Sequence, residues 1–257
     1  MSTYPPDEHA LRDLRVTSWL EAPDHAVAEM PVDVVVTDPS GAASLGAIAT
    51  LVDMACARVA LLAAHPHWIA TADLSLHLAE PVSEGGTVRA EAHLLKAGSK
   101  LISVAVDLHG AGTAMATFAR IPRAAAVIPE DRPLAVMGER MTMPLTGPPP
   151  TQRITERLAL RHTEGGVELD RHEYVFNSFG TINGGVLGFL VTAAAEDATG
   201  MIGSDLTLRY LGQTKVGPAR ASARVVRRGV CEVRVVDVGA DDALLATAIV
   251  ATGREAG

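Results

Sequence analysis

The chain has 257 residues, of which 48% are hydrophobic and 20% charged, so it can bury a substantial core. Its formal net charge of -8 and its 4% of aromatic residues argue against a nucleic-acid partner, which would need basic surface and, for single strands, aromatic platforms. The two cysteines, Cys56 and Cys231, lie in apolar runs without metal-binding or CxxC spacing, as expected of buried thiols in a reducing compartment.

Neither a secretory signal nor a membrane anchor is expected. Residues 1–20 carry acids and prolines and no apolar signal core. The longest apolar stretch, residues 45–64, contains Asp53 and Arg58, which a membrane span tolerates poorly. We therefore expect a cytoplasmic protein that does not act at a membrane.

In chain order, each half shows the same series of elements. A strand is predicted first, over residues 32–37 (VDVVVT) and 172–176 (HEYVF), followed by a long Ala- and Leu-rich helix at 44–64 and 184–198. Extended runs separated by Gly and Pro then complete each half. These runs cover 70–78, 87–95, 101–109 and 113–121 in the first half, and 202–211, 219–227, 232–238 and 243–251 in the second.

The two halves also resemble each other in sequence. Residues 43–53 (ASLGAIATLVD) align with 182–192 (INGGVLGFLVT) at an offset of 139, and residues 72–76 (ADLSL) align with 204–208 (SDLTL) at an offset of 132. The repeat exceeds a hundred residues, which is too long for a solenoid unit and indicates a duplicated domain.

A single helix followed by consecutive strands predicts an α+β fold in which an antiparallel sheet wraps a central helix, the hotdog arrangement. A Rossmann-like alternation would need a helix between successive strands. We therefore predict a double hotdog of two tandem repeats whose sheets join edge to edge. Its first copy is expected at residues 1–123, a Pro-rich linker at 124–153 and the second copy at 154–257.

The start of each predicted helix resembles the PaaI-like acyl-CoA thioesterases of the hotdog superfamily. Their motif has an amide, then His-Gly-Gly opening the helix, then an acid nine residues after the His, and a Ser or Thr on the next strand. The first copy has Ser44-Leu45-Gly46 with Asp53 and Thr71, and the second has Asn183-Gly184-Gly185 with Asn177. Each copy supplies the motif residues that the other copy lacks.

This resemblance implies one composite site that hydrolyses an acyl-CoA or another acyl-thioester. Asp53 is then the general base that activates water, or a nucleophile that attacks directly. Burial in an apolar helix should raise its pKa toward neutrality. Thr71 is expected to hold the water or to orient the carboxylate. The structural alternative for Asp53 is a buried acid that accepts hydrogen bonds.

The second copy is expected to bind the thioester carbonyl. The N–H of Gly184, at a helix start, is predicted to donate to the developing oxyanion, with the Asn177 amide as a second donor. Asn183 and Gly185 are predicted to contact the substrate. The structural alternatives are a Gly pair that forms only a tight helix entry and an Asn177 that is an ordinary cap or turn residue.

The reciprocal combination lacks these groups. Thr192 stands at the acid position, Gly203 at the hydroxyl position and Asp38 at the amide position. A carboxylate at Asp38 would oppose an oxyanion. We therefore expect one working site per chain, and a second pocket that is closed or has no acid.

Two other functions fit a hotdog fold: a dehydratase or hydratase, disfavoured because neither helix motif contains a His, and a non-catalytic acyl-CoA binding protein. The nine histidines show no HxxxH or HExxH spacing, so no metal site and no cofactor are expected. Exposed sheet edges favour association into a homo-oligomer.

Overall fold

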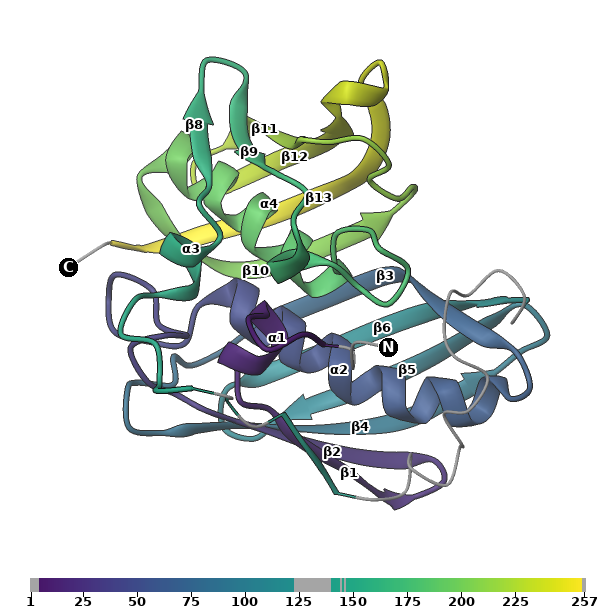
Figure 1. The fold of residues 1–257 in the computed structure, drawn as a ribbon. Coiled ribbons are helices and arrows are strands. Elements are labelled where there is room, and N and C mark those ends of the chain that lie inside the picture. Colours follow the sequence, from purple (N-terminus) through teal and green to yellow (C-terminus); the bar gives the residue numbers. More distant parts are fainter. Residues whose placement is uncertain (1–4, 123–139, 144, 146, 256–257) are drawn as a thin grey trace.

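The computed structural model describes residues 5–122, 140–143, 145 and 147–255. Two long helices lie side by side, each wrapped by strands of one continuous antiparallel sheet (Figure 1). This is the double hotdog predicted from the sequence, with one central helix in each copy.

The first copy consists of one short and one long helix and six strands. Its helices are α1 (Ala10–Asp13) and α2 (Leu45–Ala64), and its strands are β1 (Thr17–Ala22), β2 (His25–Pro31), β3 (Trp68–Leu78), β4 (Thr87–Ala97), β5 (Leu101–Leu108) and β6 (Gly112–Ile121). A short strand, β7 (Met141–Thr142), pairs with β1. Of the predicted linker, residues 124–139, 144 and 146 lie outside the described residues.

The second copy repeats this order. Its elements are α3 (Ile154–Arg157), β8 (Arg161–Thr163), β9 (Gly166–Leu169), η3 (Glu173–Val175), α4 (Gly184–Thr199), β10 (Met201–Tyr210), β11 (Ala219–Arg227), β12 (Val230–Asp237), η4 (Val238–Ala240) and β13 (Ala243–Glu255). The predicted long helices and the four runs after each of them are confirmed, with ends shifted by a few residues.

The two predicted first strands are wrong. Residues 32–37 form a turn, in which the Asp33 carboxylate accepts a hydrogen bond from the Val35 N–H, and residues 172–176 contain η3. Val35 and Val175 are buried, so the apolar residues that suggested strands instead pack a loop onto the core. The strands that open the copies are β1 and β2, and β8 and β9.

The sheets join through β3 and β10, which pair antiparallel with Ser75 opposite Thr207. The edge-to-edge junction predicted from the sequence is therefore present. Two side-chain pairs flank it: an ion pair between Asp73 and Arg209 at 3.5 Å, and a contact of 3.0 Å between Asp205 Oδ1 and His77 Nδ1. The aspartate that recurs in both copies, Asp73 and Asp205, therefore pairs across the junction in each case.

Helix α2 forms the core of the first copy. By length and composition alone it could cross a membrane, but 67% of its most apolar window is buried inside the protein. Strands β2 to β6 surround it and α4 packs along it. It has the features of the core helix that the sequence predicted.

Glycines set the spacing between α2 and α4. A Cβ at Gly185 would lie 2.6 Å from Thr50 Oγ1 and 2.8 Å from Thr50 Cα, and one at Gly46 would lie 2.8 Å from the Cα of Phe189. The offset of 139 relates Gly46 to Gly185 and Thr50 to Phe189, so these are the two halves of one pseudo-symmetric contact. Because backbone atoms are involved, a side chain at either glycine would push the helices apart.

We predict that Gly185→Ala destabilises the protein by roughly 1–3 kcal/mol, since overpacking forces backbone shifts. Gly188→Ala is the matched control: its added Cβ would lie 3.2 Å from the Ala49 methyl and 3.9 Å from backbone atoms of Gly46, without a backbone clash. Chemical denaturation of both variants measures the difference. Equal stability of the two variants would contradict the packing role assigned to Gly185.

Candidate active site

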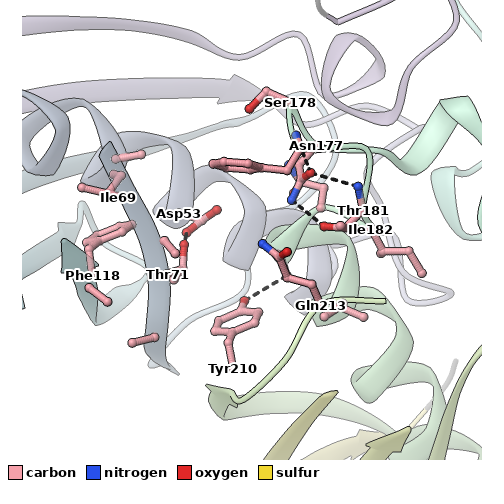
Figure 2. Close-up of a pocket in the computed structure, with 18 of the residues that line it drawn as sticks. Asp53, Ile69, Thr71, Phe118, Asn177, Ser178, Thr181, Ile182, Tyr210 and Gln213 are labelled. Atoms are coloured by element: carbon pink, nitrogen blue, oxygen red, sulfur yellow. Dashed lines mark hydrogen bonds between the residues drawn. The ribbon is translucent and has the colours of Figure 1, made fainter. Parts of the chain in front are cut away.

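A cavity of about 410 Å³ lies between the two copies. Asp53 and Thr71 of the first copy and Asn177, Asn183 and Gly184 of the second all line it (Figure 2). Five of the six predicted site residues, from two stretches more than a hundred positions apart in sequence, therefore meet at one cavity. The sixth, Gly185, does not line it and instead packs against Thr50.

Asp53 projects into this cavity from the middle of α2. Its Oδ1 accepts a hydrogen bond of 2.8 Å from the Thr71 hydroxyl on β3. Removal from water raises the pKa of Asp53 to about 6, although the Thr71 hydrogen bond acts in the opposite direction. Asp53 is consequently mostly a carboxylate near neutral pH, and a better proton acceptor than an aspartate exposed to water.

Helix α4 begins at the cavity. Asn183 caps it, its Oδ1 accepting from the Gly185 N–H at 2.9 Å, and Gly184 is the first helical residue. N–H groups in the first turn have no acceptor within the helix, and the helix dipole places partial positive charge there. The helix start therefore provides a site for a developing negative charge beside Asp53. Asn183 acts here as the cap that shapes it.

The loop before α4 is closed by the Asn177 side chain. Its Oδ1 accepts from the N–H groups of Phe179 (2.9 Å) and Thr181 (3.1 Å), and its amide nitrogen donates to Thr181 Oγ1 at 2.9 Å. One amide hydrogen is therefore engaged within the loop. This geometry gives Asn177 a clear part in shaping the cavity wall.

The N-terminal segment binds this loop through side-chain hydrogen bonds. The buried His9 ring lies with Nε2 2.7 Å from the Phe176 carbonyl, while its Nδ1 accepts from the Leu11 N–H. Burial lowers the pKa of His9, which favours the neutral ring that this pair of bonds requires. The Tyr174 hydroxyl donates to Asp13 at 2.6 Å. Residues of the first copy thus anchor the cavity loop of the second.

Tyr210, at the end of β10, was not predicted. Its hydroxyl donates to the Gly184 carbonyl at 2.9 Å, and a Cβ at Gly184 would lie 3.4 Å from its ring. Burial, and then the charges of Asp53 and Asp73, hold its pKa well above the usual value, so it stays a neutral donor. The repeat offset of 132 places Leu78 at the equivalent position, and that asymmetry between the copies could have identified Tyr210.

The rest of the lining is mostly apolar. Asp53, Ala57 and Leu61 follow one another at four-residue spacing along α2, so one stripe of the helix borders the cavity. The neighbouring wall comes from β3, β6 and the second-copy loop, with Trp68, Ile69, Phe118, Phe179 and Ile182. The cavity therefore offers a carboxylate and a helix start at one point and an apolar surface beyond them.

A second pocket, of about 300 Å³, occupies the related position near the start of α2. Asp38, Ser44, Thr192 and Glu196 are among its lining residues. The expectation of a closed or acid-free pocket is therefore wrong. Glu196 is one helical turn beyond Thr192, and its Oε1 accepts from the Gly203 N–H at 2.9 Å. Since glycine replaces the hydroxyl residue there, this longer side chain can reach the strand backbone.

Among comparisons with known proteins, one family model matches part of the first copy. Residues 41–116 match the family model of the thioesterase superfamily. No curated protein matches the chain. The match includes α2, Asp53 and Thr71, and it supports an enzyme of the hydrolase class.

Solved structures resemble the whole chain. An acyl-ACP thioesterase from Bacteroides thetaiotaomicron has a TM-score of 0.61 at 11% identity, covering 89% of this chain and 98% of its own. The 12:0-ACP thioesterase from Umbellularia californica gives 0.62 at 12%, covering 90% and 98%. The tesB protein of Mycobacterium avium subs paratuberculosis gives 0.59 at 11%, covering 93% and 95%. At these identities the likeness establishes the shared fold.

The raised pKa of Asp53 predicts a pH-dependent stability change. A folded-state value of about 6 against an ordinary 3.8 means that protonation stabilises the fold below pH 4, and that this contribution is lost as pH rises through 6. Asp53→Asn should therefore raise the free energy of unfolding at pH 8, by at most about 3 kcal/mol, with most of the gain absent at pH 4. Denaturation at both pH values measures this.

Asp73→Asn provides the control, since Asp73 pairs with Arg209 at the strand junction outside the cavity lining. That variant should show no gain at pH 8. An increase in the free energy of unfolding of similar size at pH 4 and pH 8 in Asp53→Asn would show that burial does not raise the pKa of Asp53.

Proposed function

We propose that the protein hydrolyses acyl-thioesters, with one composite site built from both copies. The observation that carries this proposal is the meeting of Asp53 and the start of α4 at one largely apolar cavity. An acyl-thioester needs an apolar place for its acyl group, a donor for its carbonyl oxygen and a base for the attacking water. The thioesterase superfamily match over residues 41–116 supports the same reaction.

In the proposed reaction the Gly184 N–H binds the thioester carbonyl oxygen. Asp53 takes a proton from a water molecule whose oxygen attacks the carbonyl carbon, and the negative charge that develops on the carbonyl oxygen is stabilised at the helix start. When the carbon–sulfur bond breaks, the protonated Asp53 returns the proton to the leaving thiolate. The products are a carboxylic acid and a thiol.

Direct attack by the Asp53 carboxylate is the alternative route. It would give an anhydride that water then hydrolyses, with the same oxyanion beside Gly184. A single turnover in ¹⁸O-labelled water separates the routes, because only the anhydride route can leave ¹⁸O in the Asp53 carboxylate. In both, Thr71 orients the carboxylate through its 2.8 Å hydrogen bond.

The polar groups near the proposed oxyanion site also support this assignment. Tyr210 and Asn177 engage the Gly184 carbonyl and the preceding loop, respectively, which holds the helix start rigid. Fixed donors stabilise a transition state because they need not reorganise during the reaction. We assign both as positioning residues, together with the cap Asn183.

The substrate class is an acyl-thioester whose acyl group lies along the Asp53–Ala57–Leu61 side of the cavity. Two structural neighbours are named as acyl-ACP thioesterases, and the helix motif resembles the PaaI-like acyl-CoA thioesterases. Both carrier types therefore belong in the assay: acyl-CoAs of increasing chain length and the matching acyl carrier proteins.

Asp53→Asn should lower kcat/KM by about 100- to 10,000-fold, the usual cost of losing a general base. Asn has the same shape but cannot accept the proton, and binding of the substrate should remain. Thiol release, followed with a thiol reagent across the substrate panel, is the measurement.

Glu196→Gln is the matched control, because it neutralises a carboxylate on the helix that lines the second pocket. We expect turnover to stay within about twofold of the parent, as for a substitution outside the reacting groups. A large loss in Glu196→Gln, or full activity in Asp53→Asn, would contradict the proposed single site.

A further inference from the structure

The outer face of the first copy carries a cluster of histidines around one glutamate. His25 on β2 lies directly opposite His93 on β4, and their rings stack with centroids 4.2 Å apart. Glu91 is two residues before His93 and so points to the same face of the strand. None of these residues lines the cavity between the copies.

The two oxygens of Glu91 have different surroundings. Oε1 accepts from Arg89 at 2.8 and 3.0 Å and lies 3.0 Å from His109 Nε2. Oε2 instead faces His25 Nε2 at 3.9 Å, which is beyond hydrogen-bond distance. Arg89 also donates to Glu29 at 2.7 Å, so its charge is shared between two carboxylates.

His25 Nε2 is a buried nitrogen that has no hydrogen-bond partner among the described residues. A buried polar atom normally has a hydrogen-bond partner. The lack of one at His25 Nε2 therefore points to a ligand that would bind this nitrogen. Candidate ligand atoms of His25, Glu91 and His93 all lie within 4.8 Å of one another. The orphan nitrogen and the second oxygen of Glu91, 3.9 Å apart, therefore lie close enough for one small ion to bind between them.

We propose that His25, Glu91 and His93 bind a divalent transition-metal ion of the zinc type. Zn²⁺ binds imidazole nitrogen and carboxylate oxygen at about 2.0–2.2 Å. Two ligand atoms 3.9 Å apart can bracket such an ion with small side-chain rotations. Two imidazoles and one carboxylate favour zinc over magnesium or calcium, which prefer oxygen ligands. His93 is exposed, so water can complete the coordination.

The ligands come from two neighbouring strands, so the ion would join β2 to β4. The sequence spacing could not predict this site, because His25 and His93 meet only through the register of those strands. The site is separate from the thioesterase proposal, and its failure would leave that proposal unaffected.

The test uses untagged full-length protein stripped with a chelator. Calorimetric titration with Zn²⁺ should give one site per chain with a dissociation constant of about 10 µM or tighter. His93→Ala and His25→Ala should each weaken binding at least about 30-fold. Co²⁺ should show a visible spectrum that both substitutions abolish.

His77→Ala is the matched control, since His77 is an exposed histidine beside Asp205 and forms no such group of three with the residues that the structure describes. It should bind Zn²⁺ as the parent does. If His25→Ala proves unstable in chelator, His93→Ala gives the same test at an exposed position. Absence of binding, or binding unchanged in both histidine variants, would overturn the proposal.

Discussion

The close approach of α2 to α4 is the constraint on which the site depends. Gly185 packs against Thr50, and Gly46 against Phe189, at distances that leave no room for a side chain. Thr50 and Asp53 are three residues apart and so share one face of α2. The glycine contact at Thr50 consequently brings the start of α4 to the carboxylate of Asp53, and packing between the copies creates the composite cavity.

This packing is nearly symmetric, whereas the chemistry is not. The same contact places a second pocket at the start of α2, but Thr192 stands there where Asp53 stands in the first pocket. The loops before the helices also differ in charge: Asn177 closes one, and Asp38 closes the other through hydrogen bonds to Ser40. Duplication explains the shared framework, and divergence of these few residues explains why we assign hydrolysis to one pocket.

Residues of both copies hold the loop and the helix start of the proposed active pocket in place. His9 binds the Phe176 carbonyl and Asp13 accepts from Tyr174, so the N-terminal segment secures the loop that precedes α4. Tyr210 then fixes the first peptide of that helix. In the proposed reaction, the preorganised helix start stabilises the oxyanion without reorganisation, and Asp53, whose pKa is raised by burial, accepts the proton from water.

The sequence predicted the parts of the fold that depend on local pattern. Periodicity predicted both central helices and the strands after them. The internal sequence similarity predicted two copies whose sheets join edge to edge. The prediction of strands at residues 32–37 and 172–176 was wrong, because the buried valines there pack a loop onto the core. Apolar alternation does not distinguish a strand from such a loop. The sequence motifs did not identify Tyr210 or Glu196, for another reason. Their positions depend on how strand ends and helix turns meet in space, which motif spacing does not describe.

The central claim is that one thioester is held between Asp53 of the first copy and Gly184 of the second. A crystal structure of Asp53→Asn with a non-hydrolysable acyl-thioester analogue tests it most directly. We expect one analogue per chain, in the cavity between Asp53 and α4, with its carbonyl oxygen about 2.7–3.1 Å from the Gly184 nitrogen. An analogue bound in the pocket of Asp38 and Glu196, or with its carbonyl directed away from Gly184, would contradict it.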